Sequence, residues 1–205
     1  MKPIRIKTNW FKKDGQPKDP AETASVLAMV LWRLADRFTV NLSQADYDII
    51  TPQRGFILMA EFLAFEVQYA DRLAYNRIDD ATRTAFIQAL AKRLSEIMEE
   101  NILEIAPNDD EGYDYKAGFI DLLNRRLVDY ATFDLVDEKP GFATLRYLGN
   151  CILEVMDKRD QPWIIDQIME IESPAAVETI KKTMRGLLET DEEYPPLPPT
   201  EITPL

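Results

Sequence analysis

The 205-residue sequence predicts an all-α protein, a single-domain bundle of seven or eight helices around a buried helix at about 52–77. Apolar residues recur at helical spacing through most of the chain. Strand signals are nearly absent. The chain has only seven glycines, few for a protein with many hairpin turns, and no paired alternating runs flank an Asn-Gly or Asp-Gly turn. We expect three parts: an extended N-terminal arm at 1–18, a helical domain at 19–188 and an extended tail at 189–205.

Helix-start signals mark the first half of the domain. Asp19-Pro20 places a carboxylate at the N-cap and a proline at the first helical position, and apolar residues follow at helical spacing. Ser43 is expected to cap a short turn. Thr51-Pro52 restarts the chain into a long helix that extends to about Arg77.

Similar signals divide the second half into further helices. Asp79 and Asp80 cap a helix that ends before Pro107, and a helix over 113–134 follows an acidic loop. Lys139-Pro140-Gly141 separates that helix from the next, over 142–155. Two further helices are expected to start at Asp160 with Pro162 and at Ser173-Pro174.

Composition excludes several classes of function. The 24 basic and 36 acidic residues give a net charge of −12, which argues against general nucleic-acid binding. Histidine is absent, so histidine bases, Ser–His and Cys–His nucleophiles and histidine-ligated metals are excluded. The one cysteine, Cys151, cannot form an internal disulfide, which favours a reducing compartment. With no signal peptide and no uninterrupted apolar span, we expect a cytoplasmic protein that does not cross a membrane.

The two terminal segments have opposite charge. The arm has six basic residues and one acidic residue, together with Trp10 and Phe11, which either fold back on the body or dock on a second subunit. The tail has five acidic residues, five prolines and no basic residue. It is either a solvated extension or a strap in which Tyr194 and Leu197 pack along the body or a neighbour.

The helix at 52–77 is apolar nearly all round, so its polar residues require an explanation. Four of them recur every seven residues and form nearly one line, with a fifth, Arg72, close to it. The members of this line are Arg54, Glu61, Gln68 and Tyr75. One interpretation is a structural seam that pairs with arginines on neighbouring helices, for example Arg33, Arg37, Arg125 or Arg126. The alternative is a cavity wall that binds an anionic ligand.

Other polar residues give weaker signals. Glu66 and Arg77 share a second side of the same helix. Arg126 lies in an aromatic stripe of the helix at 113–134, where it either pairs internally or contacts a partner. The carboxylates between Glu96 and Asp114 do not have the spacing of a calcium loop, and no Gly-rich phosphate loop is present, so we expect no metal or cofactor.

Three functional hypotheses follow from the sequence. The first is a non-catalytic protein that acts through protein–protein interaction or assembly, including a homodimer in which oppositely charged ends meet. The second is a helical receptor for a small apolar or amphipathic anionic molecule. The third is an enzyme that uses glutamate and arginine without histidine or metal. The first is the interpretation that we favour.

Overall fold

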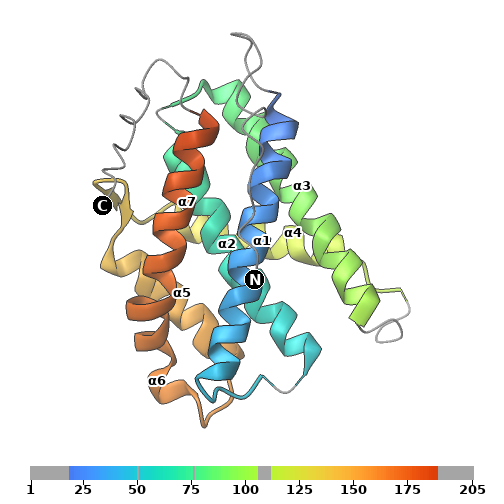
Figure 1. Ribbon diagram of the computed structural model, residues 1–205, viewed down its shortest axis with the longest axis vertical. Coiled ribbons are helices and arrows are strands. Elements are labelled where there is room, and N and C mark those ends of the chain that lie inside the picture. Colours follow the sequence, from blue (N-terminus) through green and yellow to red (C-terminus); the bar gives the residue numbers. More distant parts are fainter. Residues whose placement is uncertain (1–18, 50, 76, 106–111, 189–205) are drawn as a thin grey trace, which may run out of the picture.

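The computed structural model describes residues 19–49, 51–75, 77–105 and 112–188 (Figure 1). Most of these residues are helical, so the prediction of an all-α protein is confirmed. In chain order the elements are α1 (Pro20–Gln44), α2 (Pro52–Ala74), α3 (Asp80–Ile105), α4 (Tyr115–Tyr130), β1 (Leu135–Val136), β2 (Lys139–Pro140), α5 (Phe142–Val155), α6 (Gln161–Asp166), the π-helical segment η2 (Gln167–Glu172) and α7 (Ser173–Leu188).

Local capping sets the starts of the first two helices. The Asp19 side chain accepts a hydrogen bond from the backbone N–H of Ala21 at 3.0 Å, and Thr51 Oγ1 accepts one from the N–H of Arg54 at 3.3 Å. Two predicted boundaries are wrong. Helix α1 extends through Ser43 and ends at Gln44, just before Asp46, whose φ of 65° is incompatible with a right-handed helix. Helix α2 ends at Ala74 instead of about Arg77.

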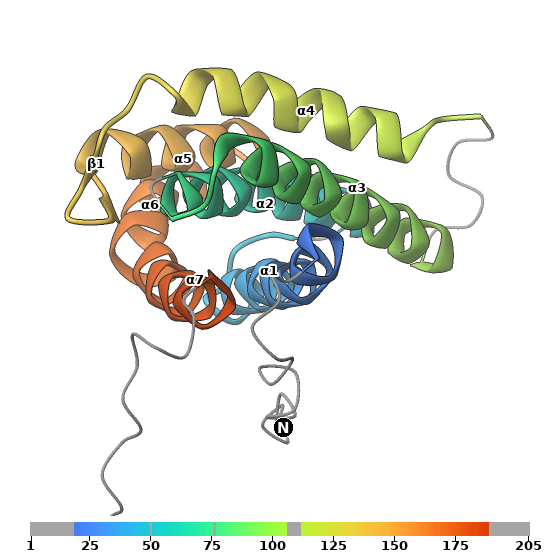
Figure 2. The ribbon, with the colours of Figure 1, turned by 90° about the horizontal axis from the view of Figure 1, so that it is seen from above.

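Helix α2 is enclosed by other helices. It packs against α1, α3, α4, α5 and α7, and every residue from Glu61 to Ala70 is buried. Figure 2 shows α4 and α5 on one side of α2 and α1 and α7 on the other. Aromatic rings link it to both sides, because Phe62 stacks on Phe38 of α1 at 4.4 Å and Phe65 contacts Tyr130 of α4. In the described ranges, no helix has the length and apolar content that crossing a bilayer would need.

The helix that was predicted over 113–134 is α4, which ends at Tyr130, and a two-strand hairpin follows it. Leu135 pairs with Pro140 and Val136 with Lys139, in antiparallel register. The two turn residues, Asp137 and Glu138, have φ angles of 50° and 60°, the left-handed geometry of a type I′ turn. Neither is the glycine that usually marks such a turn, which is why the pattern gave no strand signal.

The last two predicted helices form one continuous helical run. Helix α6 leads through η2 directly into α7, which starts at Ser173, where a helix start was predicted. A proline inside a helix lacks an N–H group, and its ring clashes with the carbonyl four residues earlier. The wider π-helical turn just before Pro174 relieves that clash while the run continues.

The described body begins and ends on the same side. Helices α1 and α7 pack against each other and run in opposite directions, so Asp19 and Leu188 lie at the same end of the molecule (Figures 1 and 2). The arm at 1–18 and the tail at 189–205, which lie outside the described residues, are therefore attached at that end.

Candidate functional site

Both arginines of the predicted polar line bind protein groups. Arg54 Nη1 forms an ion pair with Asp157 at 2.6 Å, which joins the start of α2 to the turn after α5. Arg72 Nη2 donates to the carbonyl oxygens of Ala131 and Phe133 at 3.3 and 2.5 Å, and so holds the chain that follows α4. These contacts use nitrogens that an anionic ligand would need.

Glu61 is the centre of a buried polar network between α2, α4 and α5. Its two carboxylate oxygens accept hydrogen bonds from Nε and Nη2 of Arg126, both at 2.7 Å. The Arg126 side chain is 19% exposed and that of Glu61 is 5% exposed. Arg126 Nη1 donates to the hydroxyl of Tyr147 at 3.0 Å, and that hydroxyl in turn donates to Asp129. The bidentate geometry satisfies the buried charge of Glu61 with one of the four arginines proposed as its partner.

The pKa shifts in this network favour a structural role over a role in acid–base catalysis. Hydrogen bonding to Glu61 raises the pKa of Arg126 above its already high ordinary value. Burial raises the pKa of the neighbouring Cys151 thiol to about 11, and burial followed by the hydrogen bond to Asp129 raises the pKa of Tyr147. Near pH 7 the thiol and the phenol are therefore neutral, and neither is an activated nucleophile.

Gln68 and Tyr75, the remaining members of the predicted line, lie in different environments. Gln68 is buried, and its Oε1 has no hydrogen-bond partner among the described residues. Tyr75 is 58% exposed, with the guanidinium of Arg83 5.0 Å from its ring centroid. The line therefore leads from a buried pair to the surface, and its role in ligand binding stays a prediction.

Glu66 is the most unusual buried group of α2. It is fully buried, and neither carboxyl oxygen has a hydrogen-bond partner within the described ranges. It lies one turn beyond Phe62, on the side of α2 where Phe62 stacks on Phe38. Burial raises its pKa well above the usual range, because the surrounding core disfavours the charged form. The sequence marked Glu66 as a polar residue of a buried helix but gave no partner for it.

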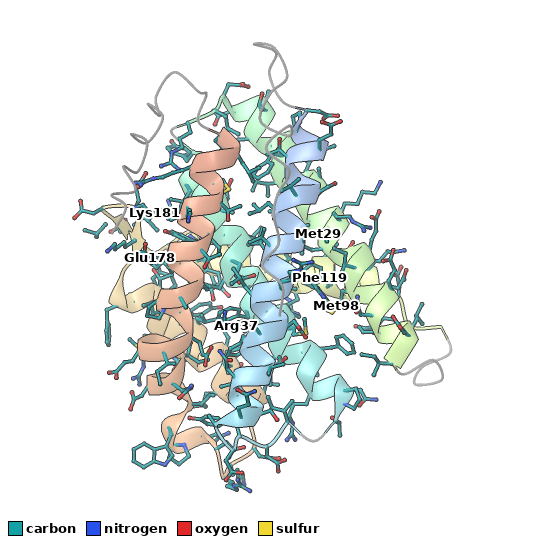
Figure 3. All side chains as sticks on the ribbon, in the orientation of Figure 1. Met29, Arg37, Met98, Phe119, Glu178 and Lys181 are labelled. Atoms are coloured by element: carbon teal, nitrogen blue, oxygen red, sulfur yellow. The ribbon has the colours of Figure 1, made fainter. Side chains whose placement is uncertain are left out.

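Three cations surround Glu138 at the tip of the hairpin. We call Arg77, Lys181 and Arg185 the cation cluster. Arg77 Nη2 lies 2.5 Å from Glu138 Oε1, and Lys181 Nζ and Arg185 Nη2 lie 2.9 and 3.2 Å from Oε2. Figure 3 shows Lys181 on the side of α7 that faces the hairpin. The hydroxyl of Tyr69 also donates to the Glu138 carbonyl at 2.8 Å, so the strained turn is fixed to α2 and α7.

The acidic stretch between Glu96 and Asp114 is partly neutralised by nearby cations. Arg93 Nη1 lies 3.1 Å from Glu96, and Lys116 Nζ lies 2.5 Å from Glu99. In the part of the chain that the structure describes, no three Asp, Glu or Cys side chains are grouped closely enough to hold a metal ion. Residues 106–111 of this stretch lie outside that part.

A hollow of about 330 Å³ lies between α3 and α4. Its walls are largely apolar and include Ile87, Ala91, Ile120 and Leu123. Lys92 also lines it and makes no ion pair with any described residue. The sequence predicted a pocket wall on the helix at 52–77 and gave no sign of this hollow, because the hollow depends on how α3 and α4 cross.

The four predicted interaction residues of the arm and tail, Trp10, Phe11, Tyr194 and Leu197, lie outside the described residues. The fifth, Arg126, is paired with Glu61 inside the body. No protein-family model matches the chain, and searches of curated proteins and of solved structures find no match.

Proposed function

We propose that the protein is non-catalytic and acts through protein–protein contact, with its oppositely charged terminal segments as the contact elements and a second copy of the chain as partner. The observation that carries this proposal is the position of Asp19 and Leu188 at one end of the body. A strongly basic segment and a strongly acidic one are thus attached near each other. Two copies that meet at this end would each place an arm near the partner's tail.

The charges of the body also support this proposal. Glu61 is held on both oxygens by Arg126, and the predicted ligand-binding arginines are engaged by Asp157 and by backbone carbonyls. An enzyme that relied on these residues would have to break those contacts before it bound a substrate.

We further propose that 19–188 is one domain, in which the helices form a bundle around α2. The burial of Glu61–Ala70 on all sides supports a single core that is shared by the other helices. The proposed compartment is the cytoplasm, because the single cysteine has no intramolecular disulfide partner.

Deleting residues 1–18 should convert the dimer into a monomer. Attraction between opposite charges weakens when salt shortens the Debye length, so high salt should have the same effect on the intact chain. Light scattering on the intact and shortened proteins, at low and high salt, measures the oligomeric mass. A control in which only Trp10 and Phe11 become serine separates apolar packing from charge. The same number of chains per particle for the intact and shortened proteins would contradict the proposed assembly.

The hollow between α3 and α4 favours a second candidate function, a receptor for an amphipathic anion. Its volume is at the lower end for ligand sites, and its apolar walls with Lys92 match an alkyl chain that ends in a carboxylate.

We expect the intact protein to bind dodecanoate saturably, and Ala91→Trp to abolish binding by filling the hollow. Lys92→Gln should weaken binding by about two- to fivefold, because one partly exposed ion pair is lost. Isothermal titration calorimetry measures the affinities, and Lys182→Gln, on α7, is the control. Equal binding by the Ala91→Trp variant would reject this candidate.

A further inference from the structure

The cation cluster has three positive charges and one carboxylate that pairs with them. Three cations share the single carboxylate of Glu138. Two further carboxylates are near in the sequence, Asp137 in the same turn and Glu178 one turn before Lys181, but neither forms an ion pair with a described residue. Figure 3 shows Glu178 and Lys181 close together on α7. In a chain with a net charge of −12, this local positive excess is unusual.

An unsatisfied donor in the cluster indicates a missing acceptor. Arg77 Nη1 is buried and has no hydrogen-bond partner in the described part of the chain. A buried N–H group without an acceptor destabilises the folded state, so such groups are normally satisfied. An additional anionic group at the cluster would supply both the missing acceptor and the missing negative charge.

The chain itself provides a suitable anionic segment nearby. Helix α7 ends at Leu188, and residues 189–193 read Glu-Thr-Asp-Glu-Glu, with four carboxylates. From Leu188 back to Lys181 is about 10 Å along the helix, and five extended residues span about 17 Å. The segment is therefore long enough to return to Lys181 and Arg185. The arm is not a suitable occupant, because it is strongly basic.

We propose that residues 189–193 dock on the cation cluster of their own chain. A short tether gives the acidic segment an effective concentration in the millimolar range, which favours this attachment over a free anion. The inference deepens the proposed function: the first part of the tail is anchored, and residues 194–205, with Tyr194 and Leu197, are left for the partner. Glu138 competes for the same three cations.

Zero-length carbodiimide cross-linking of the full chain tests this docking, because the reagent joins a lysine to a carboxylate only when the two are in contact. An equal mixture of ¹⁵N-labelled and unlabelled chains, analysed by mass spectrometry, separates links within a chain from links between chains. We expect Lys181 to be joined to residues 189–193 of its own chain, and the Lys181–Glu138 link is the internal reference. Lys182, exposed and adjacent on α7, should give at least about tenfold fewer such links.

Substitutions should change the yield of the Lys181–tail link in opposite directions. Arg185→Gln should lower it severalfold, because a cation that attracts the tail is lost. Glu138→Gln should raise it severalfold, because the competing carboxylate is lost. A merely unfolded variant would lose the preference for Lys181 over Lys182 instead. Equal yields at Lys181 and Lys182, an unchanged yield in Glu138→Gln, or links mainly between chains would each overturn the docking.

Light scattering on the same samples separates this inference from the proposed function. Suppose that deleting residues 1–18 lowers the oligomeric mass but Lys181 forms no link to residues 189–193. The proposed docking is then wrong and the proposed dimer stands. If the link forms within chains that are monomeric at every concentration, the docking stands and the assembly is wrong.

Discussion

Replacing Arg126 with methionine should lower the free energy of unfolding by about 3 kcal/mol, the largest loss that we expect from a single substitution outside the apolar core. The reason is that Glu61, only 5% exposed, would lose the partner that compensates its burial. Removing one member of a buried ion pair is costly because the remaining charge is neither hydrated nor paired. Urea denaturation at pH 7, followed by circular dichroism, measures the change.

Two controls test whether the unpaired charge is responsible. Arg125→Met changes the neighbouring residue of α4, which is exposed and donates only to the Asp121 carbonyl, so it should change stability by less than about 0.5 kcal/mol. The double variant Glu61→Met with Arg126→Met removes both charges and should recover most of the loss. If the double variant is as unstable as Arg126→Met, the loss comes from packing and not from the charge of Glu61.

Replacing Glu66 with methionine should raise the free energy of unfolding by about 1–3 kcal/mol at pH 7, the cost of a buried polar group without a partner. Methionine has a similar volume and is flexible, so the core should accept it. The same urea measurement applies. As a control, Glu100→Met on the exposed side of α3 should have little effect. Destabilisation by Glu66→Met would mean that the carboxyl group has a partner that stabilises it.

The advantage of Glu66→Met should also depend on pH. Burial raises the pKa of Glu66 in the folded state, so the folded protein keeps a proton that the unfolded chain releases above about 4.5. The stability of the natural protein therefore contains a contribution from Glu66 that is greatest below the unfolded pKa and declines as pH rises toward the folded pKa. The difference between variant and natural protein should be smallest in acid and grow toward neutral pH. A constant difference would contradict this assignment.

The contribution of Glu138 to the free energy of unfolding should change with pH in the opposite direction to that of Glu66. Hydrogen bonding to Lys181 lowers the pKa of Glu138 in the folded state, so its stabilising contribution is complete above the unfolded pKa and is lost as pH falls through the folded pKa. For this reason the test of Glu66 compares variant and natural protein at each pH, where the Glu138 contribution cancels.

The sequence was sufficient for features that depend on local signals. The caps at Asp19 and Thr51 and the apolar circumference of α2 are local, and the structure has them. The polar seam was also predictable in outline, because an ionised glutamate in an apolar helix requires a cation nearby. Which of the four proposed arginines meets Glu61 depends on how α2 and α4 cross, and sequence spacing does not determine that geometry.

Features held by distant contacts were not predictable. Glu138 adopts a left-handed conformation that its own side chain disfavours, and contacts from Tyr69, Arg77 and α7 keep it there. The π-helical turn before Pro174 likewise depends on how α6 and α7 pack as one run. The hollow between α3 and α4 exists only after both helices are placed.

Hydrogen–deuterium exchange of the full chain at low and high protein concentration tests most directly whether the terminal segments carry the contact. Association should protect residues 1–18 and 194–205, together with the start of α1 and the end of α7, and leave α4 and α5 unchanged. Protection confined to α3 and α4, or exchange independent of concentration, would contradict the proposed contact.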